Sequence, residues 1–264
     1  MRVAIAQISS GHDVARNLAS ITTAARRAAA DGAELVVFPE AAMYAFGAPL
    51  AAAAEPLDGP FATSVRLLAR ELDLTLVVGM FTPAPDGRVF NTLLAAGPAS
   101  VERYDKIHLF DAFGVRESDT VAPGGTRRTI RVATTTVGLA TCYDVRFPTL
   151  FVENAASGAL VSVLCASWAA GPGKVEQWEL LARARAADST TYLLACDQAP
   201  PQGASAGSAP SGVGHSMVVD PFGHVVARLG EDEDLLLVDL DLTVVEQARE
   251  ALPVLRNRRD PSPG

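Results

Sequence analysis

Three residues with acid–base or nucleophilic chemistry each come at the end of a short, largely apolar stretch. Glu40 closes ELVVFPE, Lys106 closes VERYDK and Cys142 closes VGLATC. A cysteine that attacks a carbonyl carbon needs a base to take its proton, and a carboxylate can serve as that base. The oxyanion formed by the attack needs hydrogen-bond donors, which the Lys106 ammonium and the backbone N–H of Tyr143 could provide. These residue types predict thiol-based chemistry if the fold brings them together.

Each of these residues also has an ordinary explanation. A cysteine in an apolar strand commonly packs as a small apolar residue, as we expect for Cys165 and Cys196. A glutamate after a proline is usually exposed, and a lysine beside Asp105 can form a surface ion pair of little energetic value. The prediction therefore depends on all three residues lying in one place.

Lysine is rare in this chain, which makes its use at position 106 informative. Of 22 basic residues, Lys106 and Lys174 are the two lysines and the other 20 are arginines. A buried lysine has a compact charge, a pKa that can be tuned and a proton to donate, whereas arginine stays charged and presents a planar fork. We therefore predict a specific role for Lys106. Lys174 follows GPG at an expected helix start, and we expect it to be solvated and inert.

Further candidates lie near these residues or near other strand ends. Arg146 follows Cys142 by one helical turn and could bind a substrate carboxylate, although pairing with Asp144 would explain it equally well. Tyr44 and Trp168 are candidate pocket residues, because loops after strand ends commonly build sites in α/β proteins.

Two other polar residues have weaker claims. Asn91 lies near a strand end on the same rim, where packing alone would explain it. His108 invites a cysteine–histidine mechanism, but the residues around Cys142 do not match the local patterns of papain-like proteases or caspases, so we do not expect His108 to be the base.

The elements that must position these side chains follow a repeated order of strand–helix–strand–helix–strand–strand–strand. This alternation predicts an α/β fold in which two mixed sheets pack face to face as a four-layer α-β-β-α sandwich. We expect one domain over 1–264, with a core of about 1–241 and a C-terminal helix and tail at 242–264. The predicted strands are 3–8, 34–40, 74–81, 88–97, 101–106, 136–144, 159–167, 191–198, 214–220, 224–230 and 234–241, and the predicted helices are 13–32, 60–73, 147–158 and 174–189. The stretches expected to be irregular are 41–58, 107–127 and 199–213.

The composition excludes several classes of protein. With 264 residues, a net charge of −8 and a pI near 5.0, the chain is not a strongly basic nucleic-acid binder. Its longest apolar runs are shorter than the ~18–20 residues of a membrane span, and MRVAIAQIS predicts a first strand rather than a signal peptide. Its three cysteines form no CxxC pair, which predicts reduced thiols in a cytoplasmic protein. The four histidines lack metal-ligand spacing, so no metal is expected.

Four sequence motifs resemble those of a known family. FPE (38–40), YDKIHLFD (104–111), ESDTVAPG (117–124) and GLATCYDVRFP (138–148) are similar, in order and spacing, to the motifs of the nitrilase superfamily of carbon–nitrogen hydrolases. The likeness extends from VAIAQI to the strand near 235–240. HLFD, ESDT, CYDVRFP and WELLARARA most resemble the branch that holds ω-amidases and deaminated-glutathione amidases.

The resemblance implies roles for particular residues. Glu40 would be the general base, Lys106 the acid and oxyanion partner, Cys142 the nucleophile and Glu117 a second glutamate that orients substrate or nucleophile. It also implies the α-β-β-α sandwich, a homodimer or larger homo-oligomer, a small-molecule amide as substrate and no cofactor.

The substrate itself stays open at this point. The Ala-rich loop at 41–56, the residues after RFP and the loop at 199–213 depart from the ω-amidase pattern. A nitrilase or an N-carbamoyl amidohydrolase on the same scaffold is an alternative, and a non-catalytic binding or assembly module is another.

Overall fold

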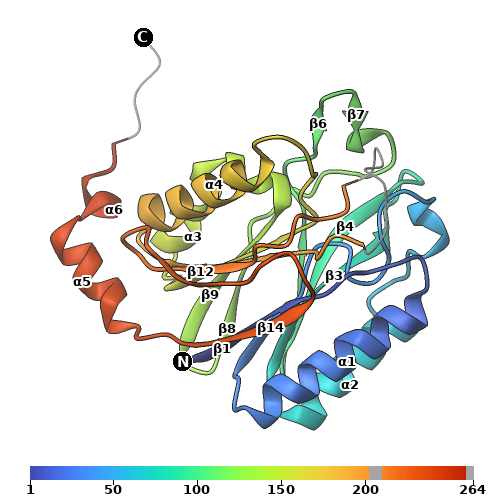
Figure 1. The fold of residues 1–264 in the computed structure, drawn as a ribbon, viewed down its shortest axis with the longest axis horizontal. Coiled ribbons are helices and arrows are strands. Elements are labelled where there is room, and N and C mark those ends of the chain that lie inside the picture. The colour runs from blue at the N-terminus through green and yellow to red at the C-terminus, as the bar shows by residue number, and fades with distance from the viewer. Residues whose placement is uncertain (202–209, 260–264) are drawn as a thin grey trace.

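The computed structural model describes residues 1–201 and 210–259. Two six-stranded sheets pack face to face, with α1 and α2 over the outer face of one sheet and α3 and α4 over the outer face of the other (Figure 1). This arrangement confirms the predicted four-layer α-β-β-α sandwich. Within the described part of the chain, no helix is long and apolar enough to cross a membrane. The helices are α1 (Val14–Ala30), α2 (Pro60–Leu72), α3 (Pro148–Ala156), α4 (Lys174–Ser189), α5 (Thr243–Ala251) and α6 (Val254–Asn257).

The two sheets share one strand order and one pattern of directions. The first runs β14-β1-β2-β3-β4-β5 and the second runs β8-β9-β10-β11-β12-β13. In each sheet the second, third and fourth strands are parallel and the other neighbours are antiparallel. The strands are β1 (Arg2–Gln7), β2 (Leu35–Val37), β3 (Thr75–Pro83), β4 (Val89–Ala96), β5 (Val101–Asp105), β8 (Thr129–Val132), β9 (Thr135–Thr141), β10 (Val161–Ala166), β11 (Tyr192–Asp197), β12 (Met217–Val219), β13 (Val225–Arg228) and β14 (Asp234–Asp239).

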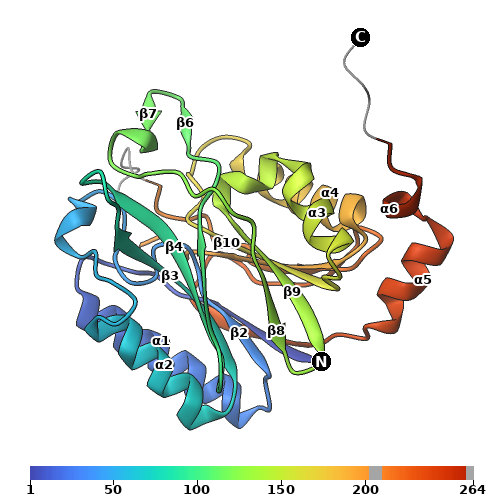
Figure 2. The ribbon, with the colours of Figure 1, turned by 180° about the vertical axis from the view of Figure 1, so that it is seen from behind.

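The edge strands show where the sequence prediction fell short. The last strand, β14, returns to pair with β1, so the first sheet is completed from the far end of the chain. The second sheet is completed by β8, which was not predicted. The stretch expected to be irregular at 107–127 contains the hairpin β6 (Asp111–Ala112) and β7 (Val115–Arg116), which stands out from the rim in Figure 2. The predicted loop at 199–213 lies partly outside the described residues, as does the end of the C-terminal tail.

The core is divided by the alternation of side chains along each strand. On β1, Val3 and Ile5 pack into the cluster between the two sheets, while Ala4 and Ala6 pack against the layer formed by α1 and α2. The apolar runs of the sequence are therefore buried on both faces, as expected for parallel strands inside a layered fold.

Two predicted strands end earlier than expected, and both ends bear on the site. The strand predicted at 34–40 is paired only over β2 (Leu35–Val37), so Glu40 lies in the turn beyond it. A Cβ on Gly79 of β3 would lie 2.6 Å from the carbonyl oxygen of Pro39, so glycine is needed for this turn to pack on β3. The strand predicted at 136–144 ends at Thr141, and a 3-10 helix spans Cys142–Arg146.

Candidate active site

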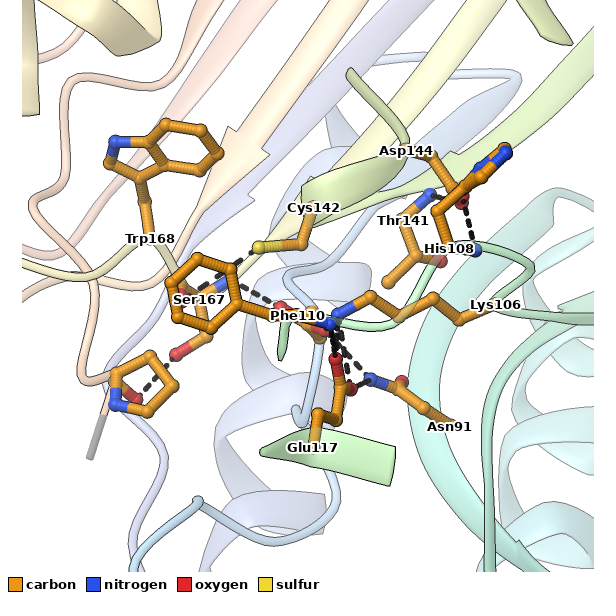
Figure 3. A network of polar contacts seen from close by, with 12 residues as sticks. Asn91, Lys106, His108, Phe110, Glu117, Thr141, Cys142, Asp144, Ser167 and Trp168 are labelled. Carbon is orange, nitrogen blue, oxygen red and sulfur yellow. Dashed lines mark hydrogen bonds and ion pairs between the residues drawn. The ribbon is translucent and has the colours of Figure 1, made fainter. Parts of the chain in front are cut away.

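The candidate catalytic side chains come from both sheets and meet at one cavity of about 590 Å³. Glu40 follows β2, Lys106 directly follows β5 and Cys142 directly follows β9. Glu117 begins a short 3-10 helix after the β6–β7 hairpin. The structure therefore brings these four predicted residues together, and Figure 3 shows Lys106, Glu117 and Cys142 converging.

Lys106 joins the two glutamates in a buried ion cluster. Its Nζ lies 2.9 Å from Oε1 of Glu40 and 2.9 Å from Oε2 of Glu117. The Lys106 and Glu40 side chains are 2 % and 1 % exposed, so water screens this contact little. The surface ion pair with Asp105, offered as an ordinary explanation of Lys106, is not what this lysine forms. Asp105 instead pairs with Arg103.

Three further groups orient the glutamates, and sequence reasoning gave none of them this role. Asn91 on β4 donates from Nδ2 to Oε1 of Glu40 at 2.7 Å and to Oε1 of Glu117 at 3.2 Å. The backbone N–H of Ser167 donates to Oε2 of Glu40 at 2.9 Å. The backbone N–H of Phe110 donates to Oε2 of Glu117 at 2.7 Å. The position of Asn91 near a strand end was noticed, but backbone donors leave no signal in a sequence.

Cys142 lies at a sharp turn between β9 and the 3-10 helix. Its φ is 45°, in the left-handed region that is costly for a residue with a Cβ. The backbone N–H groups in the first turn of a helix have no intrahelical partner, which makes the N–H of Tyr143 available as a donor beside the sulfur. The Sγ atom itself lies 4.0 Å from the carbonyl oxygen of Ser167.

Asp144 holds this turn in place. It is completely buried and accepts hydrogen bonds from the Tyr104 hydroxyl at 2.6 Å, the Thr141 N–H at 2.9 Å and the His108 N–H at 3.0 Å. His108 Nδ1 also contacts Asp144 at 2.7 Å, and the His108 ring stacks on Phe147. His108 does not line the cavity. This placement agrees with the expectation that His108 is not the base.

The ionisation of the site follows from its burial. Burial raises the pKa of Glu40, and the charge of Lys106 opposes this only in part. Burial, followed by the charge of Glu40, raises the pKa of the Cys142 thiol. Burial lowers the pKa of Lys106, but the charges of Glu117 and Glu40 outweigh it and raise that pKa well above its usual value. The resting site therefore pairs a neutral thiol with a carboxylate of raised proton affinity and a persistent positive charge.

Two of the three candidate substrate-binding residues line the cavity, and the third does not. Arg146 and Trp168 line the cavity. Arg146 donates to the side-chain oxygen of Gln177 at 3.0 Å rather than to Asp144, so the alternative explanation of Arg146 is not observed. Tyr44 does not line the cavity. Its ring packs beside that of His12, and Phe46 from the same loop lines the cavity instead.

Lys174 is the clearest correction to the sequence analysis. It is half-buried and lines the cavity, so it is neither fully solvated nor remote from the site. Its Nζ lies 5.9 Å from the centre of the Trp168 ring and 4.7 Å from that of Phe113. The loop WAAGPGK between β10 and α4 could have signalled this position, because it follows a strand end as the other site segments do.

The described residues, 1–201 and 210–259, contain no group of three or more His, Cys, Asp or Glu side chains arranged to hold a metal ion.

Asp197 is a buried carboxyl at the end of β11 that the sequence analysis did not single out. It is completely buried, and its two oxygens accept the backbone N–H of Trp168 and of Val213, each at 2.7 Å. It thereby ties two segments of the cavity wall to the sheet. Burial raises the pKa of Asp197 to about 8, although the N–H groups of Val213 and Trp168 act to lower it. Its position at a strand end is the same signal that marked Glu40.

Asp197 should make stability depend on pH. The pKa of Asp197 is about 8 in the folded protein, against an ordinary value of 3.8 for an aspartate in the unfolded chain. Between these two values the folded protein binds a proton that the unfolded chain lacks. The free energy of unfolding should therefore fall as pH rises through this window. Asp197→Asn should lack this slope, as urea denaturation of both proteins at pH 5 to 8 would show. Wild type gaining stability relative to Asp197→Asn as pH rises would contradict this assignment.

Comparison with known proteins gives a consistent family. Residues 2–250 match the family model described as "Carbon-nitrogen hydrolase". A hydrolase of Mycobacterium tuberculosis is 51 % identical, over 98 % of this chain and 96 % of its own length. Deaminated glutathione amidase of Escherichia coli is 35 % identical over 88 % of this chain and 87 % of its own length. Omega-amidase NIT2 of Homo sapiens is 31 % identical over 98 % of this chain and 95 % of its own length.

Solved structures agree with these relatives. Nit3 of Saccharomyces cerevisiae, described as a member of the nitrilase superfamily, is 30 % identical with a TM-score of 0.85 and covers 96 % of this chain and 94 % of its own. An amidase variant from Nesterenkonia sp. AN1 is 27 % identical, with a TM-score of 0.79 and coverage of 97 % of this chain and 99 % of its own. Its structure shows acrylamide added to the active-site cysteine. By fold and sequence, this chain belongs to the carbon–nitrogen hydrolase family, as the resemblance of its motifs implied, and is a hydrolase of carbon–nitrogen bonds.

Proposed function

We propose that the protein is a cysteine-dependent amidase that cleaves a small amide to a carboxylate and ammonia through a thioester. The observation that carries this proposal is the buried Glu40–Lys106–Glu117 cluster beside Cys142, which lies on the cavity wall at a turn where its φ is 45°. A structural ion pair would need neither the second glutamate nor a neighbouring thiol. The amidases among the relatives support the same reaction.

In this reaction Glu40 acts as the base and Cys142 as the nucleophile. Glu40 takes the thiol proton as the sulfur of Cys142 bonds to the amide carbon, and the resulting oxyanion accepts hydrogen bonds from Lys106 and the Tyr143 N–H. The carbon–nitrogen bond then breaks while Glu40 returns its proton to the nitrogen, releasing ammonia and leaving a thioester. Glu40 next takes a proton from water as the water oxygen bonds to the thioester carbon. The carbon–sulfur bond then breaks, Glu40 returns the proton to the sulfur, and the carboxylic acid product leaves.

The ionisation of the site refines the role expected for Lys106. A lysine whose pKa is raised well above its usual value holds its proton and is a poor acid. The carboxyl of Glu40, with its raised pKa, is better suited to carry the proton between sulfur, nitrogen and water. We therefore assign proton transfer to Glu40 and stabilisation of negative charge to Lys106, with Glu117 holding the ammonium in place.

The substrate that this cavity fits best is an amide with a carboxylate at its far end, as in an ω-amidase. Arg146 lines the cavity and contacts the neutral Gln177 rather than an acid, which leaves its charge for a ligand. Omega-amidase NIT2 and deaminated glutathione amidase are named for such activities among the relatives.

The alternatives differ in their products. A nitrilase would form an acid directly from a nitrile, and an N-carbamoyl amidohydrolase would release carbon dioxide with ammonia. A binding module would release nothing and show no hyper-reactive thiol towards iodoacetamide. An ammonia-release screen over ω-amides, carbamoyl compounds and nitriles separates these possibilities. We also propose a homodimer or larger homo-oligomer in the reducing cytoplasm, as the resemblance of the motifs implies.

Glu40→Gln should retain the fold and slow both formation and hydrolysis of the thioester. Glutamine keeps the shape of the side chain but cannot take a proton, and losing a general base typically costs ~10²–10⁴-fold. Single-turnover kinetics would resolve the two steps, and circular dichroism would check the fold. Near-normal turnover in Glu40→Gln, with Cys142 still essential, would move the base to Glu117, the other carboxylate that lines the cavity.

A further inference from the structure

The cavity carries more positive than negative charge, although the whole chain has a net charge of −8. Four cationic and two acidic side chains line it. Both acids contact Lys106, and Arg116 contacts Asp119 at 3.3 Å. The two cations that remain are Arg146 and Lys174. A cavity with this balance favours an anionic ligand.

Arg146 and Lys174 lie beside the same indole ring. The guanidinium carbon of Arg146 is 5.6 Å from the centre of the Trp168 ring and the Nζ of Lys174 is 5.9 Å from it. Trp168 also donates from Nε1 to the carbonyl oxygen of Lys174 at 3.0 Å, which fixes the lysine backbone at the start of α4. Gln177 of α4 holds Arg146. Figure 3 shows Trp168 beside Cys142, and Arg146 and Lys174 line the same cavity as these two residues.

Neither cation has a carboxylate partner among residues 1–201 and 210–259. The intervening residues 202–209 contain no Asp or Glu. A charge on a partly dry cavity wall without a counter-ion is costly, and an anion that binds there gains charge-assisted hydrogen bonds.

We propose that Lys174 is a specificity-determining residue, which with Arg146 and Trp168 forms a subsite for the substrate carboxylate distal to the amide. This inference rests on the proposed amidase function. Arg146 follows Cys142 by four residues along the 3-10 helix, a rise of about 8 Å at ~2 Å per residue. That spacing suits a small substrate whose amide reaches the sulfur while its carboxylate lies between the two cations. Lys174 then selects for the anion by binding it, not by taking part in bond cleavage.

The test compares succinamate with its methyl ester, which differ in the distal charge. Wild type should prefer the acid, and Lys174→Met should lower the acid-to-ester ratio of kcat/KM by about tenfold or more, chiefly through KM, because a charge-assisted hydrogen bond is lost. Lys174→Arg should restore most of the preference. Arg116→Met, which removes a charge from the same wall, should change the ratio by no more than about twofold, because exposed charges are screened. An unchanged ratio in Lys174→Met would overturn the proposal.

A binding measurement separates this inference from the proposed function. Titration calorimetry of Cys142→Ala with succinamate requires no turnover, and adding Lys174→Met should weaken binding by about tenfold. If both proteins bound succinamate equally, the subsite would be wrong even if the enzyme were an amidase. If Lys174 controlled binding but ammonia were never released from any amide, the amidase proposal would fail and the subsite would stand. Thermal melting checks that each variant is folded.

Discussion

Cys142→Ala should abolish turnover while leaving the protein folded. Alanine keeps the backbone but removes the sulfur that forms the thioester, and loss of a nucleophile that acts with its base as a unit typically costs ~10⁶-fold. Because the thiol is 8 % exposed, on the cavity wall, its removal leaves space that the open cavity can accommodate. Ammonia release under saturating amide measures the effect, and circular dichroism with thermal melting verifies the fold.

The other two cysteines are matched controls. Cys165 and Cys196 are completely buried at paired positions of the neighbouring strands β10 and β11, and neither lines the cavity. Their alanine variants should lower stability, on the order of 1 kcal/mol, as core truncations do, and keep most of the activity. Loss of turnover in either control, with Cys142→Ala still active, would show that the nucleophile has been assigned to the wrong thiol.

Lys106→Arg should also be nearly inactive, although it keeps the positive charge. The Lys106 side chain is 2 % exposed and held between two carboxylates, so a longer planar guanidinium must displace them. The change therefore removes a compact oxyanion donor, which typically costs ~10²–10³-fold, and also moves the base, which costs ~10²–10⁴-fold. The combined loss should exceed that of Glu40→Gln in the same ammonia-release assay.

Lys174→Arg is the matching control because it makes the same substitution on the same cavity. Lys174 touches aromatic rings rather than carboxylates and is half-buried, so an arginine can lie there and keep the charge. We expect a change of no more than about threefold in kcat. Wild-type activity in Lys106→Arg would show that charge alone suffices at position 106, whatever the shape of the group that carries it.

Much of the fold could be predicted from the sequence because apolar runs alternate with amphipathic stretches over nearly the whole chain. The repeated order of elements was enough to predict two packed sheets with helices outside. It could not predict that β14 pairs with β1, because the sequence of an edge strand does not indicate which of two sheets that strand joins. It did not predict β8, because this four-residue strand (TIRV) has only two buried side chains and so shows little apolar periodicity.

The site shows the same division between local and long-range information. Glu40, Lys106 and Cys142 could be found because each is a reactive residue type after a strand, and Asp197 could have been found by the same rule. The backbone donors from Ser167 and Phe110, by contrast, exist only after folding. Lys174 was misplaced because a lysine after glycine at a helix start is usually solvated. Here the indole N–H of Trp168 donates a hydrogen bond to the carbonyl oxygen of Lys174 and so holds that helix start at the cavity.

The most direct test of the account is to trap the acyl-enzyme. The protein would be quenched in acid during turnover of a slowly hydrolysed amide, digested and analysed by mass spectrometry. The account predicts an added mass equal to the acyl group on the peptide that contains Cys142, absent from Cys142→Ala. An acyl group on the peptide of Cys165 or Cys196, with Cys142 unmodified, would contradict it.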